Sequence, residues 1–305
     1  MHLSRLDAAP AFSHMKDTTQ AIMSPIQSSN AENGELNKFN SVLRLLFPCT
    51  VHIQKINSLE GHVHCLRLLT LSNGVQLMLK CSPSPTTALL RRERFLLETE
   101  ARALALLAQN ANPCVPQLYH YDPHGTLLGP SFLVRQHVMG STLQEMEDHL
   151  TVDDRKDIDR HLGFLVNVIG QHAAPTFGPL EEVASGCGKK SWREAFIELF
   201  ESVLRDAEDM FIHLPYAEIR REVSRLAPAL EGVTLSRLVV VDLGQPSQVI
   251  LDPGSKQVSG VVDFSTAVWG DVLMAEIFED PSPAVLDGFG SRLSKDKSEI
   301  TRLLL

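Results

Sequence analysis

Two strand-forming apolar runs in the last quarter of the chain each end in an aspartate. The run 238–241 is rich in β-branched residues and stops at Asp242, and the run 258–262 stops at Asp263. A polar loop, a short strand and a tight turn at 252–255 are predicted between the two aspartates, so the second run returns antiparallel. A hairpin of this length can bring both carboxylates to one side of a cleft.

A loop aspartate combined with a strand-end aspartate is the arrangement that ATP-dependent phosphoryl transfer uses. One carboxylate orients the acceptor hydroxyl, and the other holds Mg²⁺ on the phosphates. The structural alternative is that Asp242 and Asp263 only terminate strands as turn-forming residues. Taken alone, the two aspartates are compatible with both interpretations.

A lysine and a glutamate in the first third of the chain form a second candidate pair. Residues 75–81 alternate between two faces, and Lys80 ends the polar face of this predicted strand. Residues 91–109 lack Gly and Pro and predict a helix, on which Glu100 lies in an otherwise apolar stripe. A carboxylate in an apolar stripe is unfavourable without a cationic partner, for which Lys80 is the candidate. The alternative is that both are ordinary surface residues.

Three sequence blocks in the C-terminal half carry a family resemblance. They are D-L-x-x-P-x-Q-V-I-L-D from Asp242, G-V-V-D-F from Gly260, and W-G-D ending at Asp271. In order and spacing they resemble the catalytic and metal loops of the aminoglycoside phosphotransferase family, which shares its architecture with protein kinases and choline kinases. The resemblance covers residues 38–290. It implies an α+β, protein-kinase-like fold of two lobes, and ATP-dependent transfer of a phosphoryl group to a small-molecule hydroxyl.

The resemblance also implies a role for each candidate site residue. Asp242 would orient the acceptor hydroxyl as the catalytic residue, and Lys80, oriented by Glu100, would bind the phosphates of ATP. Asp263 and Gln248 would hold Mg²⁺, because a glutamine carbonyl can ligate a hard cation through its oxygen. ATP and Mg²⁺ are therefore the expected cofactors.

The chain departs from the family pattern at several positions. Val240 and Val241 stand where the family has histidine and glycine, and Gln248 stands near the place of the family's asparagine. A further family aspartate falls on Ala275 or Glu276. Because the histidine braces the catalytic loop in the family, Val240 is expected to support this loop only by packing.

Four further residues complete the predicted nucleotide site. Gly61 falls where a phosphate-covering turn would lie between two strands, and an ordinary hairpin turn is the alternative there. Gln136, His137 and Val138 end a predicted strand and would form the hinge whose backbone groups meet the adenine edge. Such backbone contacts leave little signature in the side chains.

Two other local patterns are interpreted as structural. His62 and His64 are predicted to be strand residues, because no third metal ligand accompanies them. The segment 186–191 superficially resembles a phosphate-binding loop but lacks the spacing of that motif, and no strand precedes it. It predicts a flexible connection before a helix.

Composition is compatible with a two-lobed globular enzyme of a reducing compartment. Its 305 residues, 44% hydrophobic and 21% charged, suffice for two domains. The five cysteines are odd in number and scattered, which favours neither a disulfide framework nor a zinc site. No membrane-spanning segment or signal peptide is visible, so a cytoplasmic protein without a membrane partner is expected. The net charge of −9 argues against a nucleic-acid partner and is compatible with a small-molecule substrate.

The predicted elements divide the chain into three parts. Residues 1–35 show no sustained periodicity and predict a disordered tail. Residues 36–137 begin with a helix and continue as a strand-rich, nucleotide-binding lobe, and residues 138–305 form a mainly helical lobe with the catalytic hairpin. The longest helices predicted in that second lobe span 155–169, 191–211 and 216–230.

Two alternatives to an active enzyme fit the sequence. A pseudokinase-type nucleotide-binding or scaffolding protein would share the fold but have little transfer activity, which the departures in the catalytic loop favour. An unrelated α+β protein would bind no nucleotide at all. No recognisable motif for binding an acceptor lies between residues 153 and 230, so the sequence does not identify the substrate.

Overall fold

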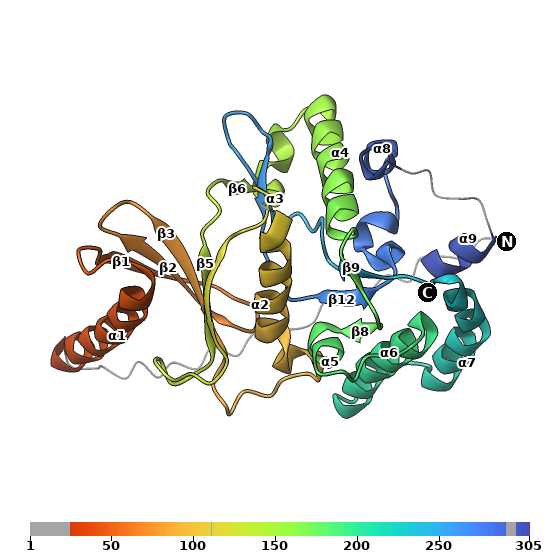
Figure 1. Cartoon of the computed structure of the whole chain (residues 1–305), viewed down its shortest axis with the longest axis horizontal. Helices are drawn as coiled ribbons and strands as arrows, with labels where there is room; N and C mark the ends of the chain where they lie inside the picture. Colours follow the sequence, from red (N-terminus) through yellow and green to blue (C-terminus); the bar gives the residue numbers. More distant parts are fainter. Residues whose placement is uncertain (1–24, 111, 291–296) are drawn as a thin grey trace.

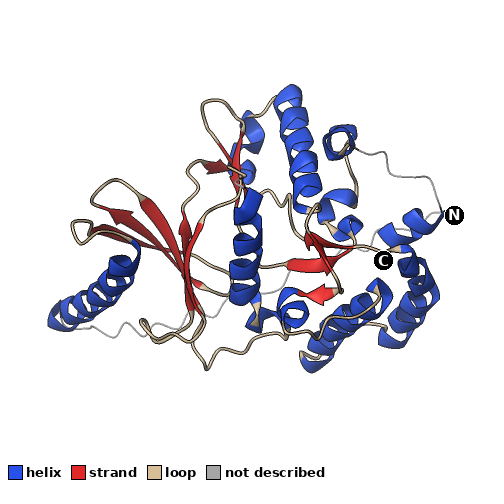
Figure 2. Cartoon of the chain, in the orientation of Figure 1, coloured by secondary structure: helices blue, strands red, loops and turns tan. Residues whose placement is uncertain are grey.

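The chain folds into two lobes, one built on a β-sheet and the other mainly on helices (Figure 1). The computed structural model describes residues 25–110, 112–290 and 297–305. Each lobe has a hydrophobic core of its own. Figure 2 shows most of the long strands on one side of the molecule and most of the helices on the other. The predicted α+β, two-lobed fold is confirmed.

The N-terminal lobe consists of one helix packed against a five-stranded sheet in the order β1-β2-β3-β5-β4. All neighbouring strands are antiparallel. The elements are α1 (Pro25–Leu46), β1 (Ile53–Leu59), β2 (Cys65–Leu71), β3 (Gln76–Cys81), β4 (Leu118–Asp122) and β5 (Phe132–Gln136). The helix contributes Phe39, Val42 and Leu43 to the core of this lobe, where they pack near buried side chains of the sheet.

The first helix begins earlier than the sequence predicts. Residues 25–35, expected to belong to the disordered tail, are helical, whereas residues 1–24 lie outside the described part of the chain. Pro25 occupies the first turn, where proline is tolerated, and the next proline is Pro48, just after the helix ends. Residues 25–35 are polar and contain no proline after Pro25. Their composition suggested a disordered tail, although it is compatible with a helix.

A helix between the lobes carries Glu100. The predicted helix 91–109 is divided into a 3₁₀ turn, η1 (Arg92–Arg94), then α2 (Leu96–Leu107) and a closing 3₁₀ turn, η2 (Ala108–Asn110). In Figure 1, α2 stands between the sheet and the helical lobe. Its inner residues Ala103, Leu104 and Leu107 belong to the core of the C-terminal lobe. The helix therefore connects the two lobes.

The C-terminal lobe surrounds two small sheets with helices. One sheet has the order β11-β10-β6 and the other β7-β9-β12-β8. The strands are β6 (Ser141–Thr142), β7 (Ala173–Ala174), β8 (Gly178–Pro179), β9 (Ser236–Val240), β10 (Val249–Leu251), β11 (Val258–Val261) and β12 (Ala267–Gly270). The α-helices are α3 (Leu143–Met146), α4 (Val152–Ile169), α5 (Leu180–Ala184), α6 (Trp192–Asp209), α7 (Tyr216–Leu226), α8 (Pro283–Phe289) and α9 (Lys297–Leu303). Short 3₁₀ turns are η3 (Glu147–His149), η4 (Ala227–Gly232), η5 (Val272–Met274) and η6 (Glu276–Phe278).

The ends of two helices differ from the prediction for local reasons. α4, predicted from residue 155, begins at Val152 because Thr151 and Asp154 form a reciprocal capping box. α7, predicted to reach Leu230, ends at Leu226 and continues as the 3₁₀ turn η4, since Pro228 removes a backbone donor there.

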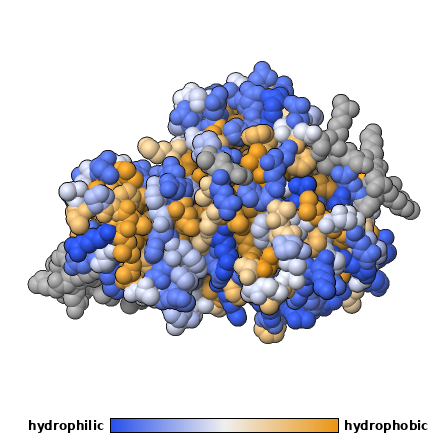
Figure 3. Space-filling model, viewed as in Figure 1, coloured by the Kyte–Doolittle hydropathy of each residue, from blue (hydrophilic) through white to orange (hydrophobic). Residues whose placement is uncertain are grey.

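The described surface mixes hydrophilic and hydrophobic residues. In the view of Figure 3, blue residues cover much of the helical lobe, and hydrophobic ones gather conspicuously over the N-terminal lobe. None of the described helices combines the length and the apolar character needed to cross a membrane.

Candidate active site

A buried glutamate accepts hydrogen bonds from two cations at the junction of the lobes. Lys80 Nζ on β3 lies 2.6 Å from Glu100 Oε2 on α2, and the glutamate side chain is fully buried. Arg135 Nε on β5 donates to the other carboxylate oxygen at 3.1 Å. A buried carboxylate needs cationic partners, and these two contacts explain why a glutamate can occupy an otherwise apolar stripe of the helix. The predicted contact between Lys80 and Glu100 is present.

Sequence reasoning overlooked Arg135. It lies two residues from Leu133, which pairs with Lys80, so Arg135 and Lys80 share one face of the sheet. The available signal was a single charge directly after the apolar run 132–134 of a predicted strand. The strand was predicted, but its register against β3 decides which face meets Glu100.

Asp263 reaches the same lysine from the C-terminal lobe. Its Oδ2 lies 3.5 Å from Lys80 Nζ, and Ser265 N–H donates to its Oδ1 at 3.0 Å. Burial acts to raise the pKa of Asp263, but Lys80 and the hydrogen bonds from Ser265 outweigh it and lower the pKa. Burial also opposes the charge on Lys80, yet Glu100 and Asp263 raise the pKa of the lysine overall. Both groups are therefore charged at neutral pH.

Asp263 adopts an unusual backbone conformation. Its φ is +81°, in the left-handed region that few non-glycine residues occupy, with aspartate among the more tolerant. Such conformations concentrate at functional sites when the surrounding structure enforces them. Here the residue is the second one after the strand β11 and begins the turn that leads to Thr266.

Asp242 is held through both carboxylate oxygens. Thr266 Oγ1 donates a short hydrogen bond to Oδ1, and Gln248 Nε2 donates to Oδ2 at 2.7 Å. Val240, which replaces the family's histidine, is buried and pairs with Ala267 on β12. The valine does pack as expected, but sequence reasoning missed the polar support from Thr266, which follows Asp263 by three residues.

Gln248 has an oxygen that suits a hard cation. Its Oε1 is buried and has no hydrogen-bond partner among the described residues, which is unusual because buried polar atoms are nearly always satisfied. The N–H of Val262 donates to the Gln248 carbonyl at 2.9 Å, so the hairpin places Gln248 beside the neighbour of Asp263. No group of three or more His, Cys, Asp or Glu side chains in the described chain could hold a metal. Magnesium, however, typically takes one or two protein oxygens and completes its shell with phosphate and water. The oxygens of Asp263 and Gln248 fit this requirement.

The hairpin between these residues has the predicted geometry. β10 and β11 pair antiparallel. The carboxylate of Asp252 accepts hydrogen bonds from the N–H groups of Gly254 and Ser255 at 3.1 and 2.6 Å, which fixes the tight turn.

Gly61 lies in the loop between β1 and β2. A Cβ atom there would stand 2.2 Å from the carbonyl oxygen of His64, so the close approach of the backbone requires glycine. The same bend corrects the prediction for His62 and His64, which lie in the loop and not in a strand. The strand β2 begins only at Cys65.

His64 is buried beside the cations and carboxylates of the site. Burial and the charge of Lys80 lower the pKa of His64 to about 4, with Asp263 acting in the opposite direction. The imidazole is therefore neutral at neutral pH. Apart from its position three residues after Gly61, nothing in the sequence signals this contact.

The three predicted hinge residues differ in the availability of their backbone groups. The N–H groups of Gln136 and His137 donate to the carbonyls of Gln117 and Gln76 at 2.8 and 3.3 Å. The backbone of Val138 makes no hydrogen bond to the described residues. Val138 is thus the hinge position best able to offer both backbone groups to a ligand.

The departure at Glu276 is explained by a local contact. Its N–H donates to the carbonyl of Val241 at 2.8 Å, and its carboxylate accepts a hydrogen bond from Gln245 in the loop after Asp242. Ala275 is buried in the core. Glu276, one of the two positions on which the family's aspartate falls, therefore supports the loop after Asp242.

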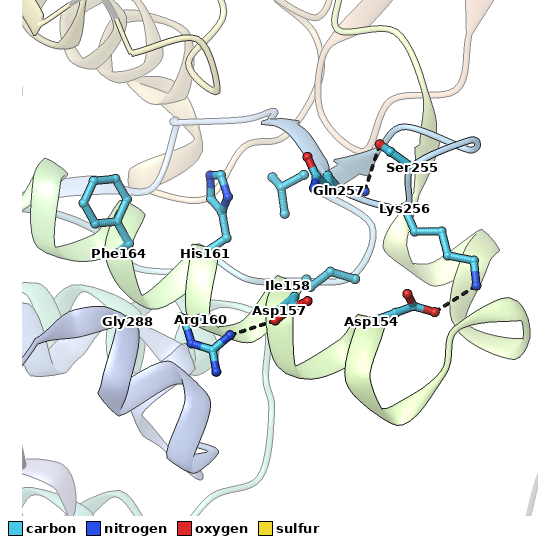
Figure 4. Close-up of a pocket in the computed structure, with 11 residues that line it drawn as sticks. Asp154, Asp157, Ile158, Arg160, His161, Phe164, Ser255, Lys256, Gln257 and Gly288 are labelled. Carbon is cyan, nitrogen blue, oxygen red and sulfur yellow. Dashed lines mark hydrogen bonds and ion pairs between the residues drawn. The ribbon is translucent and has the colours of Figure 1, made fainter.

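Several cavities open on the C-terminal lobe. One of about 610 Å³ lies between α4, the β10–β11 turn and α8, and its wall carries an ion pair between Lys256 and Asp154 at 2.8 Å (Figure 4). None of the predicted site residues lines it. A second cavity, of about 570 Å³, is lined by residues 243–246 of the loop after Asp242. A third, of about 770 Å³, lies between η1, α5 and α6.

Comparison with solved structures identifies the fold. The macrolide 2′-phosphotransferase of Brachybacterium faecium has a TM-score of 0.55 and 18% identity, over 87% of this chain and 88% of that one. A putative aminoglycoside phosphotransferase from Ralstonia eutropha has a TM-score of 0.57 and 12% identity, over 87% and 85% of the two chains. A putative fructosamine-3-kinase from Thermobifida fusca has a TM-score of 0.54 and 20% identity, over 79% and 80%.

No protein-family model and no curated protein sequence matches the chain. The similarity to solved structures nevertheless spans both lobes, and it confirms the architecture that the sequence resemblance implies. The chain has the two-lobed, kinase-like fold of small-molecule phosphotransferases.

Proposed function

We propose that the protein transfers the γ-phosphoryl group of ATP to a hydroxyl group of a small molecule. The observation that carries this proposal is the position of Lys80, which contacts Glu100 on α2 and Asp263 at the end of the catalytic hairpin. The proposed nucleotide site thus lies between a lobe of residues 36–137 and a lobe of residues 138–305. The scattered, odd-numbered cysteines support a cytoplasmic location.

In the proposed mechanism, Asp242 receives a hydrogen bond from the acceptor hydroxyl. The bond from the acceptor oxygen to the γ-phosphorus forms as the bond from that phosphorus to the β,γ-bridging oxygen breaks, so ADP leaves and the hydroxyl proton passes late to Asp242. Lys80 binds the phosphates, and Val138 offers its backbone to the adenine. Asp263 and Gln248 would hold Mg²⁺, which neutralises charge on the β- and γ-phosphates when bound.

Ligands of other proteins with this fold support nucleotide and small-molecule binding. One aminoglycoside phosphotransferase was solved with AMP-PNP and hygromycin B, and another with GDP and kanamycin. These proteins are at most 20% identical to the chain, so they suggest the class of ligand and not its identity.

An ADP-release assay with a panel of hydroxyl-bearing compounds, including kanamycin, hygromycin B and a macrolide, tests the proposal. We expect one compound class to stimulate ADP release, and Asp242→Asn to abolish this stimulation. Asp252→Asn, a change at an exposed turn of the same hairpin, is the matched control and should retain it. If Asp242→Asn keeps full acceptor-dependent release, the proposed role of Asp242 is wrong.

A nucleotide-binding protein with little transfer activity is the second candidate. It is favoured by the hydrogen bonds that Thr266 and Gln248 make to both oxygens of Asp242, which compete with an acceptor hydroxyl. This candidate predicts Mg²⁺-dependent ATP binding together with ADP release that no acceptor stimulates.

A further inference from the structure

An arginine just before the inter-lobe helix reaches the turn that follows Asp263. Arg92 lies in η1, and its Nη2 donates to the carbonyl oxygen of Thr266 at 3.2 Å. The hydroxyl of the same threonine donates to Asp242. Thr266 therefore connects the guanidinium of Arg92 to the carboxylate of Asp242 through two hydrogen bonds.

The charge of Arg92 has no ion-pair partner in the described chain. The adjacent Arg91, by contrast, forms ion pairs with Asp206 and Asp209 at 2.5 and 2.7 Å. Arg92 is partly buried, and burial lowers its pKa, an effect that the charges of Glu181 and Asp242 oppose from a longer distance. Because a guanidinium presents five N–H donors and burying an unpaired charge is unfavourable, this side chain is suited to bind an anion.

The position of Arg92 indicates which anion. Its guanidinium is connected to Asp242 through Thr266, and Asp242 is one of the two carboxylates whose charge acts on it. Lys80, the proposed phosphate ligand, contacts Asp263, which precedes Thr266 by only three residues. The loop from Asp242 to Gln248 contains no lysine or arginine, so it supplies no cation of its own to the transferred group.

We propose that Arg92 binds the γ-phosphate of the nucleotide beside Asp242, the point from which the phosphoryl group is transferred. This inference rests on the proposed function. The planar guanidinium can donate two parallel hydrogen bonds to phosphate oxygens, a geometry that lysine cannot reproduce. Arg92 is thereby assigned a role that discriminates the triphosphate from the diphosphate, whereas Lys80 contacts phosphates that both nucleotides share.

Calorimetric titration of the full chain with Mg²⁺ and either AMP-PNP or ADP tests this assignment. In Arg92→Met we expect the affinity for AMP-PNP to fall on the order of 10- to 100-fold, as for a lost hydrogen bond between charged groups, with unchanged affinity for ADP. Arg92→Lys, which keeps the charge, should retain part of the affinity for AMP-PNP. Arg94→Met, an exposed change in the same 3₁₀ turn, is the matched control and should bind both nucleotides like the wild type.

Each other result would overturn the inference in a recognisable way. Equal losses for AMP-PNP and ADP in Arg92→Met would mean that Arg92 supports the fold of the site and not the γ-phosphate. Unchanged binding of both nucleotides would remove any role for it in nucleotide recognition. A wild-type protein that binds neither nucleotide would overturn the proposed function, and this inference with it.

Discussion

At the scale of single residues, the support of Asp242 shows how a missing side chain is replaced. The family's histidine is absent, and Val240 contributes only packing within the β9–β12 pair. The hydroxyl of Thr266 and the amide of Gln248 take over the polar contacts to the carboxylate. The sequence indicated Asp242 because its strand ends there, whereas Thr266 is one of many threonines until the turn after Asp263 is known.

His64 gives a residue-scale prediction about pH. The pKa of His64 is about 4 in the folded protein, against 6.5 for the ordinary residue, because of burial first and then the charge of Lys80. The unfolded chain therefore takes up a proton between these pH values that the folded chain does not, and the folded state loses stability as pH falls through this window. The loss approaches about 3 kcal/mol below pH 4, at 1.36 kcal/mol per pKa unit.

The measurement is urea unfolding at pH 7, 5 and 4. Relative to wild type, His64→Gln should lose distinctly less stability between pH 7 and pH 4, whereas His62→Gln, at an exposed position two residues away, should follow the wild type. An identical pH dependence for wild type and His64→Gln would show that His64 is not responsible.

At the scale of elements, Glu100 joins β3, α2 and β5. Its position in an apolar stripe, together with strand alternation that places Lys80, made the pair with Lys80 a candidate from local periodicity. The contact with Arg135 depends on the pairing of β3 with β5, which connects residues more than 50 positions apart and has no local signature. The start of α1 was missed for the opposite reason, since its polar sequence lacks an apolar stripe that would have revealed a helix.

Removing the charge of Glu100 tests this junction. Glu100→Gln leaves the buried cations Lys80 and Arg135 without their carboxylate, so we expect a loss of about 3–5 kcal/mol in the free energy of unfolding. Glu98→Gln on the same helix breaks only an exposed pair with Arg102 and should cost under about 1 kcal/mol. Urea midpoints for the two variants measure the difference. Similar midpoints would mean that the buried pair does not stabilise the junction.

At the scale of the whole molecule, two cores are connected by a helix that contributes to both the fold and the site. The order of strands and helices along the chain was sufficient to predict an α+β fold of two lobes. Contacts such as that of Arg92 with Thr266, which lie 174 positions apart, follow only from how α2 packs against the C-terminal lobe. For this reason, the sequence indicated charged residues of the candidate site such as Lys80 and Asp263. It did not indicate Arg92 and Thr266, which contact each other across the lobes.

The thermal unfolding midpoint with ATP alone, Mg²⁺ alone and both together tests whether this junction binds a nucleotide. For wild type, ATP with Mg²⁺ at about 100 times the dissociation constant should add about 2.7 kcal/mol, a shift of several degrees. Asp263→Ala removes the predicted metal ligand and should abolish the Mg²⁺-dependent part of that shift. If ATP and Mg²⁺ together leave the wild-type midpoint unchanged, the junction of Lys80, Glu100 and Asp263 is a structural ion-pair network and not a nucleotide site.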